Sequence, residues 1–414
     1  MASWKGYAAA YIAGGLTVFG LEWWYSAPSV SLTAIRKAID ARDLEKAKSQ
    51  LVSYLRHSPD DLQAHLMLAG LLTERGEHEG SLKHLSQIQG TCTWALEARF
   101  REGKVLRELN RVREAEAAWI ECLTIDQSQN PPDMGGIARY ATAELLKVYI
   151  FQRRRRDAED LLWNLYRRVP PADRARAMLA LLKAQLRQHP REDVMHEVEK
   201  FVAADPEDDH SRRELGRLYV EFGEEKRGRE LLKTYVDRRP EDLESLAAYV
   251  WCLTEQGDLP AAKDVLANLP VDAGRNGELW HLRGVVHELS QEWDDAADCL
   301  RHALALEPWR RETHAHLANV LRHLGDRAGT QQHEDRAKEL LQIIEKLNKV
   351  QETLEATLAM PDAETAFMLA DLHEKGGRLE EARAWYVETL RLDVRHAEAK
   401  AAIARLGRPT VLLR

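Results

Sequence analysis

The stretch from Asp209 to Pro240, DHSRRELGRLYVEFGEEKRGRELLKTYVDRRP, contains two short amphipathic segments joined by a glycine and closed by a proline. Small and apolar residues recur at helical spacing in each half: Leu215, Gly216 and Tyr219 in the first, and Gly228, Leu232 and Tyr235 in the second. Both halves can therefore bury one face as a helix. Gly223 marks the turn between them, and Pro240 cannot continue the second helix.

The same pattern recurs along most of the chain. One position of each first helix can be followed through Ile35, Ala69, Gly103, Leu146, Leu182, Gly216, Val250, Gly284, Ala318 and Ala370, and six of the nine steps are 34 residues. Twelve residues after each of these stand Ala47, Ser81, Ala115, Ala158, Val194, Gly228, Ala262, Ala296, Thr330 and Ala382, nine of which are Ala, Gly, Ser or Thr. Prolines close five of the units, at Pro59, Pro170, Pro206, Pro240 and Pro308. A 34-residue helical repeat is therefore predicted.

This arrangement resembles the tetratricopeptide repeat, a unit of two helices with small residues where the helices touch and a proline after the second helix. The segment containing Trp280, Gly284, Ala296 and Pro308 also has the first-helix tryptophan of that family. The resemblance covers about nine tenths of the chain and implies an all-α, right-handed superhelical solenoid of about ten repeats. Three positions depart from the pattern in the fourth and fifth repeats, where the helix spacing need not follow it: Leu146, Leu182 and Val194.

Two long steps between repeats divide the predicted solenoid. The step from Gly103 to Leu146 contains a polar segment rich in Pro and Gly, which predicts a loop. The step from Ala318 to Ala370 contains an apolar stripe, which predicts one long helix or a helix pair. That stripe is formed by Leu340, Ile344, Leu347, Val350, Leu354 and Leu358. The predicted organisation is an N-terminal segment (1–27), repeats 1–3 (28–128), an inserted loop (129–137), repeats 4–9 (138–333), an extended helix (334–360), repeat 10 (361–395), a capping helix (396–406) and a tail (407–414).

The N-terminal segment departs from the repeat pattern, because Gly6 to Leu21, GYAAAYIAGGLTVFGL, carries no charge. Trp4 and Trp23 bracket it, and a helix between them would rise about 28 Å, close to the hydrocarbon core of a bilayer. We therefore predict a retained single-pass membrane anchor, with a cleaved signal peptide or a buried first helix as the alternatives. Because Lys5 precedes the span, the positive-inside rule places the repeats outside the cytoplasm, as at a bacterial-type inner membrane facing the periplasm.

The composition and the motifs argue against several classes of function. The net charge of −8 over 414 residues does not suit a general nucleic-acid binder. The four cysteines lack the short spacing of zinc or redox motifs and are expected to be small buried residues. The His-Glu pairs lack the second His of a zinc-protease helix, and the glycine spacing of Gly223 to Arg229 lacks the Lys of a phosphate loop. We therefore predict a protein that is not an enzyme and has no cofactor or metal. Six histidines crowd two adjacent repeats and leave a metal or pH-sensitive site as an alternative: His281, His287, His302, His314, His316 and His323.

The predicted partners are other proteins. In the family that the chain resembles, the first helices line a concave groove in which peptides lie, and the groove residues singled out here are Arg101, Lys104, Arg107, Lys147, Lys183, Arg187, Arg213, Arg217 and Trp251. These residues make the middle of the groove basic, whereas later repeats carry mostly acidic residues, so an acidic peptide segment is expected at the centre. Gly6, Ala10 and Gly14 recur every four residues and would let two apolar helices pack as a homo-oligomer. The predicted function is a membrane-tethered, non-enzymatic scaffold for complex assembly, with a soluble regulator or adaptor as the alternative.

Overall fold

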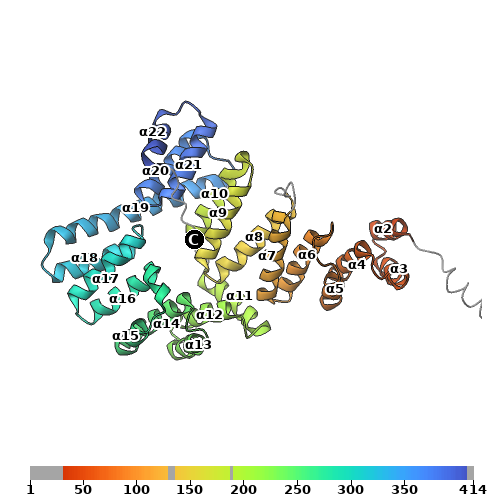
Figure 1. The fold of residues 1–414 in the computed structure, drawn as a ribbon, viewed down its shortest axis with the longest axis horizontal. Coiled ribbons are helices and arrows are strands. Elements are labelled where there is room, and N and C mark those ends of the chain that lie inside the picture. The colour runs from red at the N-terminus through yellow and green to blue at the C-terminus, as the bar shows by residue number, and fades with distance from the viewer. Residues whose placement is uncertain (1–30, 129–135, 187–189, 408–414) are drawn as a thin grey trace, which may run out of the picture. The chain divides into compact units, whose positions relative to one another are not determined.

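The computed structural model describes residues 31–128, 136–186 and 190–407, which form α-helices, two short 3-10 helices and connecting turns (Figure 1). The chain divides into two compact units. Of the described residues, those up to Leu109 and those within Glu114–Ala141 form the first unit, and Asn110–Arg113 and those from Thr142 onward form the second. The all-helical architecture predicted from the sequence is confirmed for the residues that the structure describes.

The first unit is a run of helices in which each packs against the next. Its helices are α2 (Leu32–Asp40), α3 (Leu44–His57), α4 (Leu62–Glu74), α5 (His78–Leu85), α6 (Ala95–Glu108) and most of α7 (Val112–Ser128). Trp119 of α7 packs on Gly103 of α6 and donates its indole N–H to the carbonyl oxygen of Phe100 at 3.2 Å. The large indole fits because Gly103 carries no side chain.

The second unit continues the same kind of packing over a longer run of helices. Its helices are most of α8 (Ile137–Phe151), then α9 (Arg155–Arg168), η1 (Pro171–Asp173), α10 (Arg174–Leu186), α11 (Arg191–Ala204), α12 (Asp209–Glu221), α13 (Glu225–Arg238), α14 (Leu243–Glu255), α15 (Leu259–Ala267), η2 (Val271–Arg275), α16 (Gly277–Leu289), α17 (Trp293–Leu306), α18 (Arg311–His323), α19 (Arg327–Thr357), α20 (Ala363–Lys375), α21 (Leu379–Leu392) and α22 (Ala397–Leu406).

Helix starts and turns in the second unit follow the 34-residue spacing. The side chains of Asp208, Asp242 and Asn276 accept hydrogen bonds from backbone N–H groups in the first turns of α12, α14 and α16. Such caps satisfy donors that have no partner within the helix. Gly223 and Gly257 turn the chain after α12 and α14 at φ of +82° and +71°, where glycine avoids a steric cost.

Gly216 and Gly228 allow α12 and α13 to approach closely. A Cβ atom on Gly228 would lie 2.6 Å from the carbonyl oxygen of Gly216, and a Cβ atom on Gly216 would lie 2.7 Å from Cγ of Leu232. Both distances are shorter than van der Waals contact, so a larger residue would force the helices apart. This contact explains why the sequence places small residues twelve positions apart.

The chain leaves the regular repeat at α10 and closes the second unit on itself. α10 packs against α9, α19 and α21, whereas α11 packs against α12. Figure 1 shows α11 leading away from α10, and α20 and α21 lying beside α9 and α10. One apolar cluster joins these distant segments and includes Met178, Leu181 and Leu182 of α10, Leu340 and Ile343 of α19, and Trp385 of α21. The sequence resemblance alone implies an open solenoid at this point.

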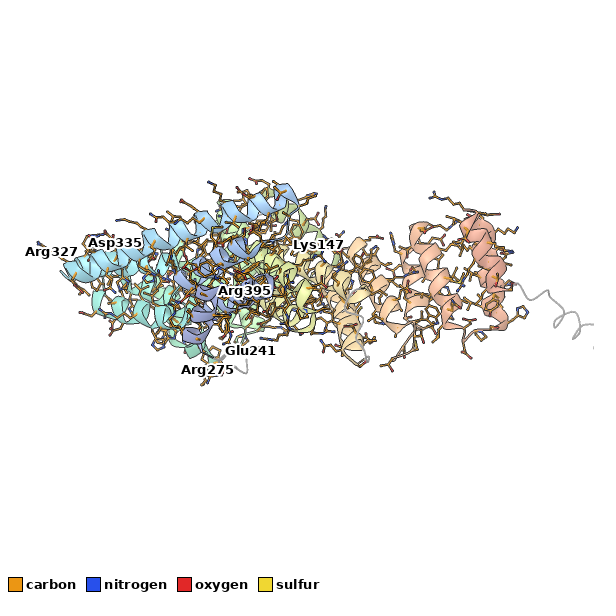
Figure 2. All side chains as sticks on the ribbon, turned by 90° about the horizontal axis from the view of Figure 1, so that it is seen from above. Lys147, Glu241, Arg275, Arg327, Asp335 and Arg395 are labelled. Carbon is orange, nitrogen blue, oxygen red and sulfur yellow. The ribbon has the colours of Figure 1, made fainter. Side chains whose placement is uncertain are left out.

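The long helix α19 has a different buried face from the predicted stripe. It is a single helix of 31 residues, and its buried residues are Leu340, Ile343 and Leu347. Ile344 and Leu358, which the predicted stripe included, are exposed. Charged residues such as Arg327 and Asp335 are exposed along the same helix (Figure 2). Because α19 packs against α10 and α20, Ile343 is buried in place of the predicted Ile344.

The predicted single-pass membrane location, with the repeats outside the cytoplasm, is contradicted. Among residues 31–128, 136–186 and 190–407, no helix has the length and apolar character needed to cross a bilayer. The physical reason is that these helices bury one face and expose charged residues on the other. The segment Gly6 to Leu21, on which the prediction and the proposed self-association rested, lies outside the described residues. So does most of the predicted inserted loop.

Candidate functional site

The predicted groove residues of the first unit all lie on α6. Arg101 forms an ion pair with Glu97 and donates a hydrogen bond to the carbonyl oxygen of Leu66 at 3.4 Å. The Nζ atom of Lys104 lies 6.0 Å from the centre of the Phe100 ring. Arg107 lies in the last turn of α6. The structure therefore brings Arg101, Lys104 and Arg107 onto one helix of the first unit.

The other predicted basic residues belong to the second unit. Two of them, Lys147 and Lys183, lie on different helices and pair with different glutamates. Lys147 is exposed on α8 and pairs with Glu144 at 2.8 Å (Figure 2). Lys183 on α10 pairs with Glu355 of α19 at 2.6 Å, so it takes part in the contact that closes the second unit. Arg187 lies outside the described residues.

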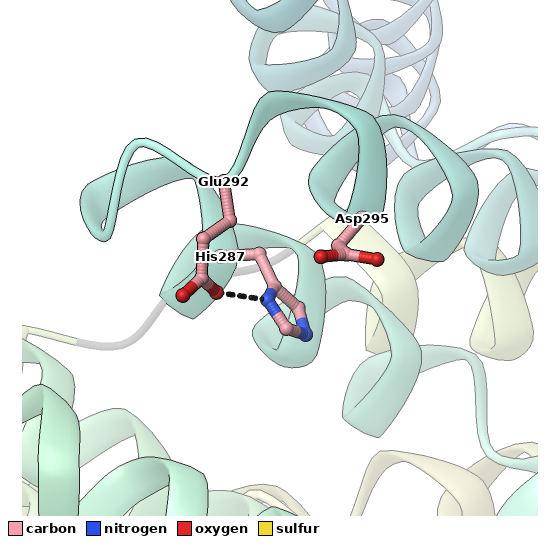
Figure 3. A group of neighbouring side chains, drawn as sticks. All are labelled: His287, Glu292 and Asp295. Carbon is pink, nitrogen blue, oxygen red and sulfur yellow. Dashed lines mark hydrogen bonds and ion pairs between the residues drawn. The ribbon is translucent and has the colours of Figure 1, made fainter.

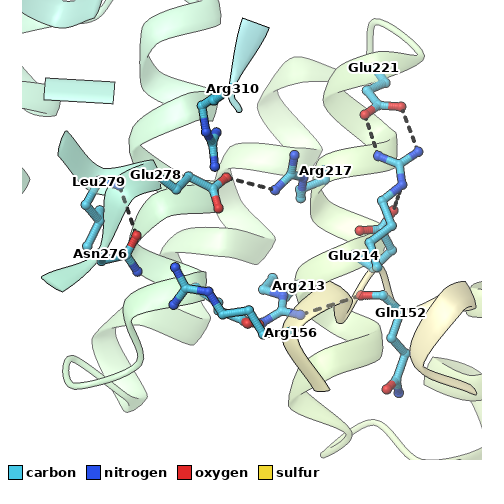
Figure 4. Close-up of polar contacts among 12 residues, drawn as sticks. Gln152, Arg156, Arg213, Glu214, Arg217, Glu221, Asn276, Glu278, Leu279 and Arg310 are labelled. Carbon is cyan, nitrogen blue, oxygen red and sulfur yellow. Dashed lines mark hydrogen bonds and ion pairs between the residues drawn. The ribbon is translucent and has the colours of Figure 1, made fainter. Parts of the chain in front are cut away.

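Arg213, Arg217 and Trp251 lie together with Glu278 on one side of α12, α14 and α16, which we call the inner face. Arg213 is buried, forms an ion pair with Glu244 and donates to the carbonyl oxygen of Gln152 at 3.5 Å. Nη1 of Arg217 lies 4.0 Å from Glu278, and its guanidinium carbon lies 5.1 Å from the centre of the Trp251 ring. Figure 4 shows Arg217 directed toward Glu278 and Arg213 directed toward Gln152.

These pairs change the charge pattern that the sequence predicts. The basic residues of α12 contact acidic residues of the following repeats, Glu244 on α14 and Glu278 on α16. A basic centre and a separate acidic region therefore do not describe the inner face. Opposite charges are interleaved there, because the first helices of successive repeats, α12, α14 and α16, lie side by side.

A cluster around Glu214 was missed by reasoning from the sequence. Its carboxylate is fully buried in α12, and Nε of Arg153 lies 3.0 Å away. Burial raises the pKa of Glu214 to about 7, against the lowering effect of Arg153, Arg217 and Arg213. Arg153 also pairs with Glu221 at 2.7 Å. The repeat register gives no signal for this cluster, since it places the turn that carries Arg153 two repeats away from α12.

The six histidines that crowd two repeats in the sequence do not gather at one point; His281 and His316 meet edge to face, with ring centres 5.4 Å apart, and the others have separate partners. The ring of His302 lies tilted against Trp280 with ring centres 4.1 Å apart, His323 stacks on Trp293, and Nδ1 of His314 lies 2.9 Å from Nδ1 of His333. His316 pairs with Glu288 at 2.6 Å. Burial, with Arg310 and His316 nearby, lowers the pKa of the neighbouring His281 to about 3. These histidines therefore have different local partners and do not form one metal or pH-sensitive site.

One group of side chains has the donor types of a metal site. The ligand atoms of His287, Glu292 and Asp295 lie within 4.8 Å of one another at the turn between α16 and α17 (Figure 3). Nδ1 of His287 lies 2.6 Å from Glu292, and Lys263 also pairs with Glu292 at 2.7 Å. The lysine competes with a cation for this carboxylate, so the group has an explanation as an ordinary ion-pair network.

Three of the four cysteines have the buried environments expected from the sequence. Cys122, Cys252 and Cys299 are buried free thiols, whereas Cys92 is half-buried. Burial raises the pKa of Cys252 and of Cys299 to about 11. A thiol with such a pKa is a poor nucleophile at neutral pH.

Comparisons with known proteins agree with the helical repeat. The model of a tetratricopeptide repeat-like domain matches residues 24–134, and the model of the tetratricopeptide repeat matches residues 324–393. No curated protein matches the sequence of this chain.

Several solved structures are similar to parts of the chain. MamA from Desulfovibrio magneticus RS-1 is 16% identical, with 41% of this chain and 96% of that chain covered and a TM-score of 0.32. A tetratricopeptide repeat protein from Parabacteroides merdae is 13% identical, with 64% and 97% covered and a TM-score of 0.32. The pilF protein of Pseudomonas aeruginosa is 16% identical, with 57% and 99% covered and a TM-score of 0.33. At this level of similarity, none of them indicates a partner for this chain.

The family follows from the repeat itself and from the two matching models. Caps and turns recur at 34 residues, and the small residues lie where paired helices touch. The matching models cover separate segments in the first and second units. The chain belongs to the tetratricopeptide repeat family.

Proposed function

We propose that the chain is a non-enzymatic scaffold that binds partner proteins through the inner face of its second unit and supports the assembly of a complex. The observation that carries the proposal is the half-buried Trp251 with Arg217 over its ring. Tryptophan and arginine are enriched among the residues that dominate binding energy in protein interfaces. Trp251 keeps part of its surface for a partner to cover.

The contacts that hold Arg217 and its neighbour Arg213 in place are those expected of a binding surface. Arg213, one helical turn before Arg217 in α12, is held by Glu244 and by the backbone of Gln152. Glu278 limits the positions that Arg217 can adopt. A preorganised side chain loses less conformational entropy on binding, so the same contacts give a higher affinity. Arg217 offers positive charge to an acidic segment of such a partner.

The test uses Trp251→Ala with Trp293→Ala as a matched control. Trp293 is also a half-buried tryptophan of the second unit, but it lies at the start of α17 and stacks on His323. The full-length proteins are crosslinked in cells that produce the chain naturally, and the captured proteins are identified. We expect a partner that the wild type and Trp293→Ala capture and that Trp251→Ala loses. Equal capture by both variants would remove the inner face from the proposal.

A further inference from the structure

Four arginines gather where the second unit closes on itself, and none of them belongs to the groove that the sequence predicts. Arg155 and Arg156 begin α9, Arg310 precedes α18, and Arg378 precedes α21. The closure brings the three segments together: Nη2 of Arg156 lies 3.8 Å from Glu307, and Nη1 of Arg378 lies 3.6 Å from Glu159 of α9. Arg156 and Arg310 are drawn in the same close-up as Arg213 and Arg217 (Figure 4).

The carboxylates in contact with these arginines are shared between them. Glu159 contacts both Arg155, at 3.2 Å, and Arg378. Glu307 contacts both Arg310, at 2.6 Å, and Arg156. Arg378 has a further partner in Glu381 at 3.1 Å. Among residues 31–128, 136–186 and 190–407, three carboxylates therefore hold the four guanidinium groups, which leaves about one positive charge without an equivalent acid in this part of the chain.

The surroundings of Arg155 agree with this excess of positive charge. Its side chain is 55% exposed, so it has lost part of its contact with solvent. This partial loss of solvent, together with Arg378 and Arg310, holds the pKa of Arg155 below its usual range. A bound anion would relieve the repulsion between these cations.

Two of the four arginines are placed to receive that anion. Arg155 and Arg156 have exposed fractions of 55% and 49%, whereas Arg310 and Arg378 are more covered. Arg378 is further fixed by the ring of Trp309, 5.1 Å from its guanidinium carbon. The covered pair therefore supplies fixed positive charge behind two accessible guanidinium groups, which can each bind an oxyanion through two N–H donors.

We propose that this four-arginine cluster binds a carboxylate from an acidic segment of a partner protein. The inference rests on the proposed scaffold function and adds a site made from turns of non-adjacent repeats. One carboxylate matches the excess of about one positive charge better than a phosphate dianion does. A single exposed ion pair contributes little to affinity, so the carboxylate is carried by a segment that makes other contacts on the same unit.

The experiment measures fluorescence anisotropy of labelled octaglutamate with the full-length protein at low salt. The test variant is Arg155→Ala with Arg156→Ala. The matched control is Arg238→Ala with Arg239→Ala, an adjacent pair at the end of α13 with exposed fractions of 41% and 56% and with acidic partners of their own. We expect about a tenfold or greater loss of octaglutamate affinity in the test variant and less than about twofold in the control.

Further measurements distinguish a carboxylate from inorganic phosphate as the bound anion, and distinguish failure of the arginine site from failure of the scaffold function. Arg156→Gln alone, whose ion-pair contact is the long one to Glu307, is measured in case the double variant fails to fold, and it is expected to lose about threefold or more in affinity. Equal losses in the test and control pairs would overturn the site. Binding of inorganic phosphate without binding of octaglutamate would overturn the choice of a carboxylate. A natural partner that requires Trp251 but binds the Arg155/Arg156 variant unchanged would overturn the acidic segment and leave the scaffold function standing.

Discussion

The Nε atom of Arg153 lies 3.0 Å from the buried carboxylate of Glu214 and joins two helical hairpins that are not consecutive in the chain. Arg153 adopts φ of 48° at the turn between α8 and α9, a conformation that costs a residue with a side chain roughly 1 kcal/mol. Glycine occupies the corresponding turn at Gly223 and Gly257. At this turn the chain therefore has an arginine where glycine would be less strained, and the guanidinium of Arg153 contacts the carboxylate of Glu214.

Glu214→Gln should stabilise the protein more at pH 8 than at pH 5. The pKa of Glu214 is raised from 4.5 to about 7, so its contribution to stability is present at low pH and is lost as the pH rises through 7. Glutamine cannot ionise and avoids this loss. We expect the change in the free energy of unfolding caused by the substitution to be more favourable at pH 8 by roughly 2 kcal/mol, as measured by urea unfolding at both pH values.

Glu221→Gln is the matched control with the opposite sign. Arg153 also pairs with Glu221, but there the hydrogen bond from Arg153 and the charges of Arg153 and Arg191 hold the pKa below its usual value despite partial burial. Its stabilising effect is present at high pH and lost as the pH falls below 4.5. The same pH dependence in both variants would show that Glu214 does not retain a proton in the fold.

His373→Leu should make the protein more resistant to acid. His373 is buried in α20, neither ring nitrogen has a hydrogen-bond partner among the described residues, and burial lowers its pKa to about 3. Because the unfolded chain takes up a proton near pH 6.5 and the folded chain does not, the wild type loses about 1.4 kcal/mol for each pH unit below 6.5. We expect a smaller fall in melting temperature between pH 7 and pH 4.5 in the variant. An unchanged fall would contradict the neutral buried state of His373.

The helical repeat was predictable because its signals are local. Caps such as Asp208 and Asp242, turns such as Gly223, and the small residues Gly216 and Gly228 each act within one repeat or between its two helices. Spacing along the chain is then sufficient to identify them. The family resemblance rests on the same local features, and the comparisons confirm it.

The closure of the second unit was not predictable in this way. Met178 and Trp385 share one apolar cluster although their helices are far apart in sequence, and either residue could equally serve an ordinary repeat core. Single-sequence spacing contains no information about such a pairing. The acidic partners of Arg213 and Arg217 were missed for the same reason, and the basic groove was inferred as if its charges stood alone.

Gly228→Ala should destabilise the second unit by about 1–3 kcal/mol, whereas Gly274→Ala should have little effect. The new methyl group on Gly228 would lie 2.6 Å from the carbonyl oxygen of Gly216, and this neighbour belongs to the backbone of α12. A Cβ atom on Gly274 meets nothing within 4 Å, and the backbone there needs no positive φ. Thermal unfolding of both variants measures the difference. Equal melting temperatures would contradict the close approach of α12 and α13.

Leu182→Asp should open the closed second unit while α12 to α15 stay folded. Leu182 is buried in the cluster that α10 shares with α19 and α21, so an aspartate there would place a charge without a partner in an apolar contact. We expect faster hydrogen exchange in α20 and α21, a larger radius of gyration by small-angle scattering, and unchanged exchange in α14. Leu55→Asp, which disturbs the core of the first unit instead, is the matched control and should leave α20 and α21 protected. Protection of α20 and α21 that survives Leu182→Asp would mean that the last repeats hold together without α10, and the closure would then be no more than a weak contact.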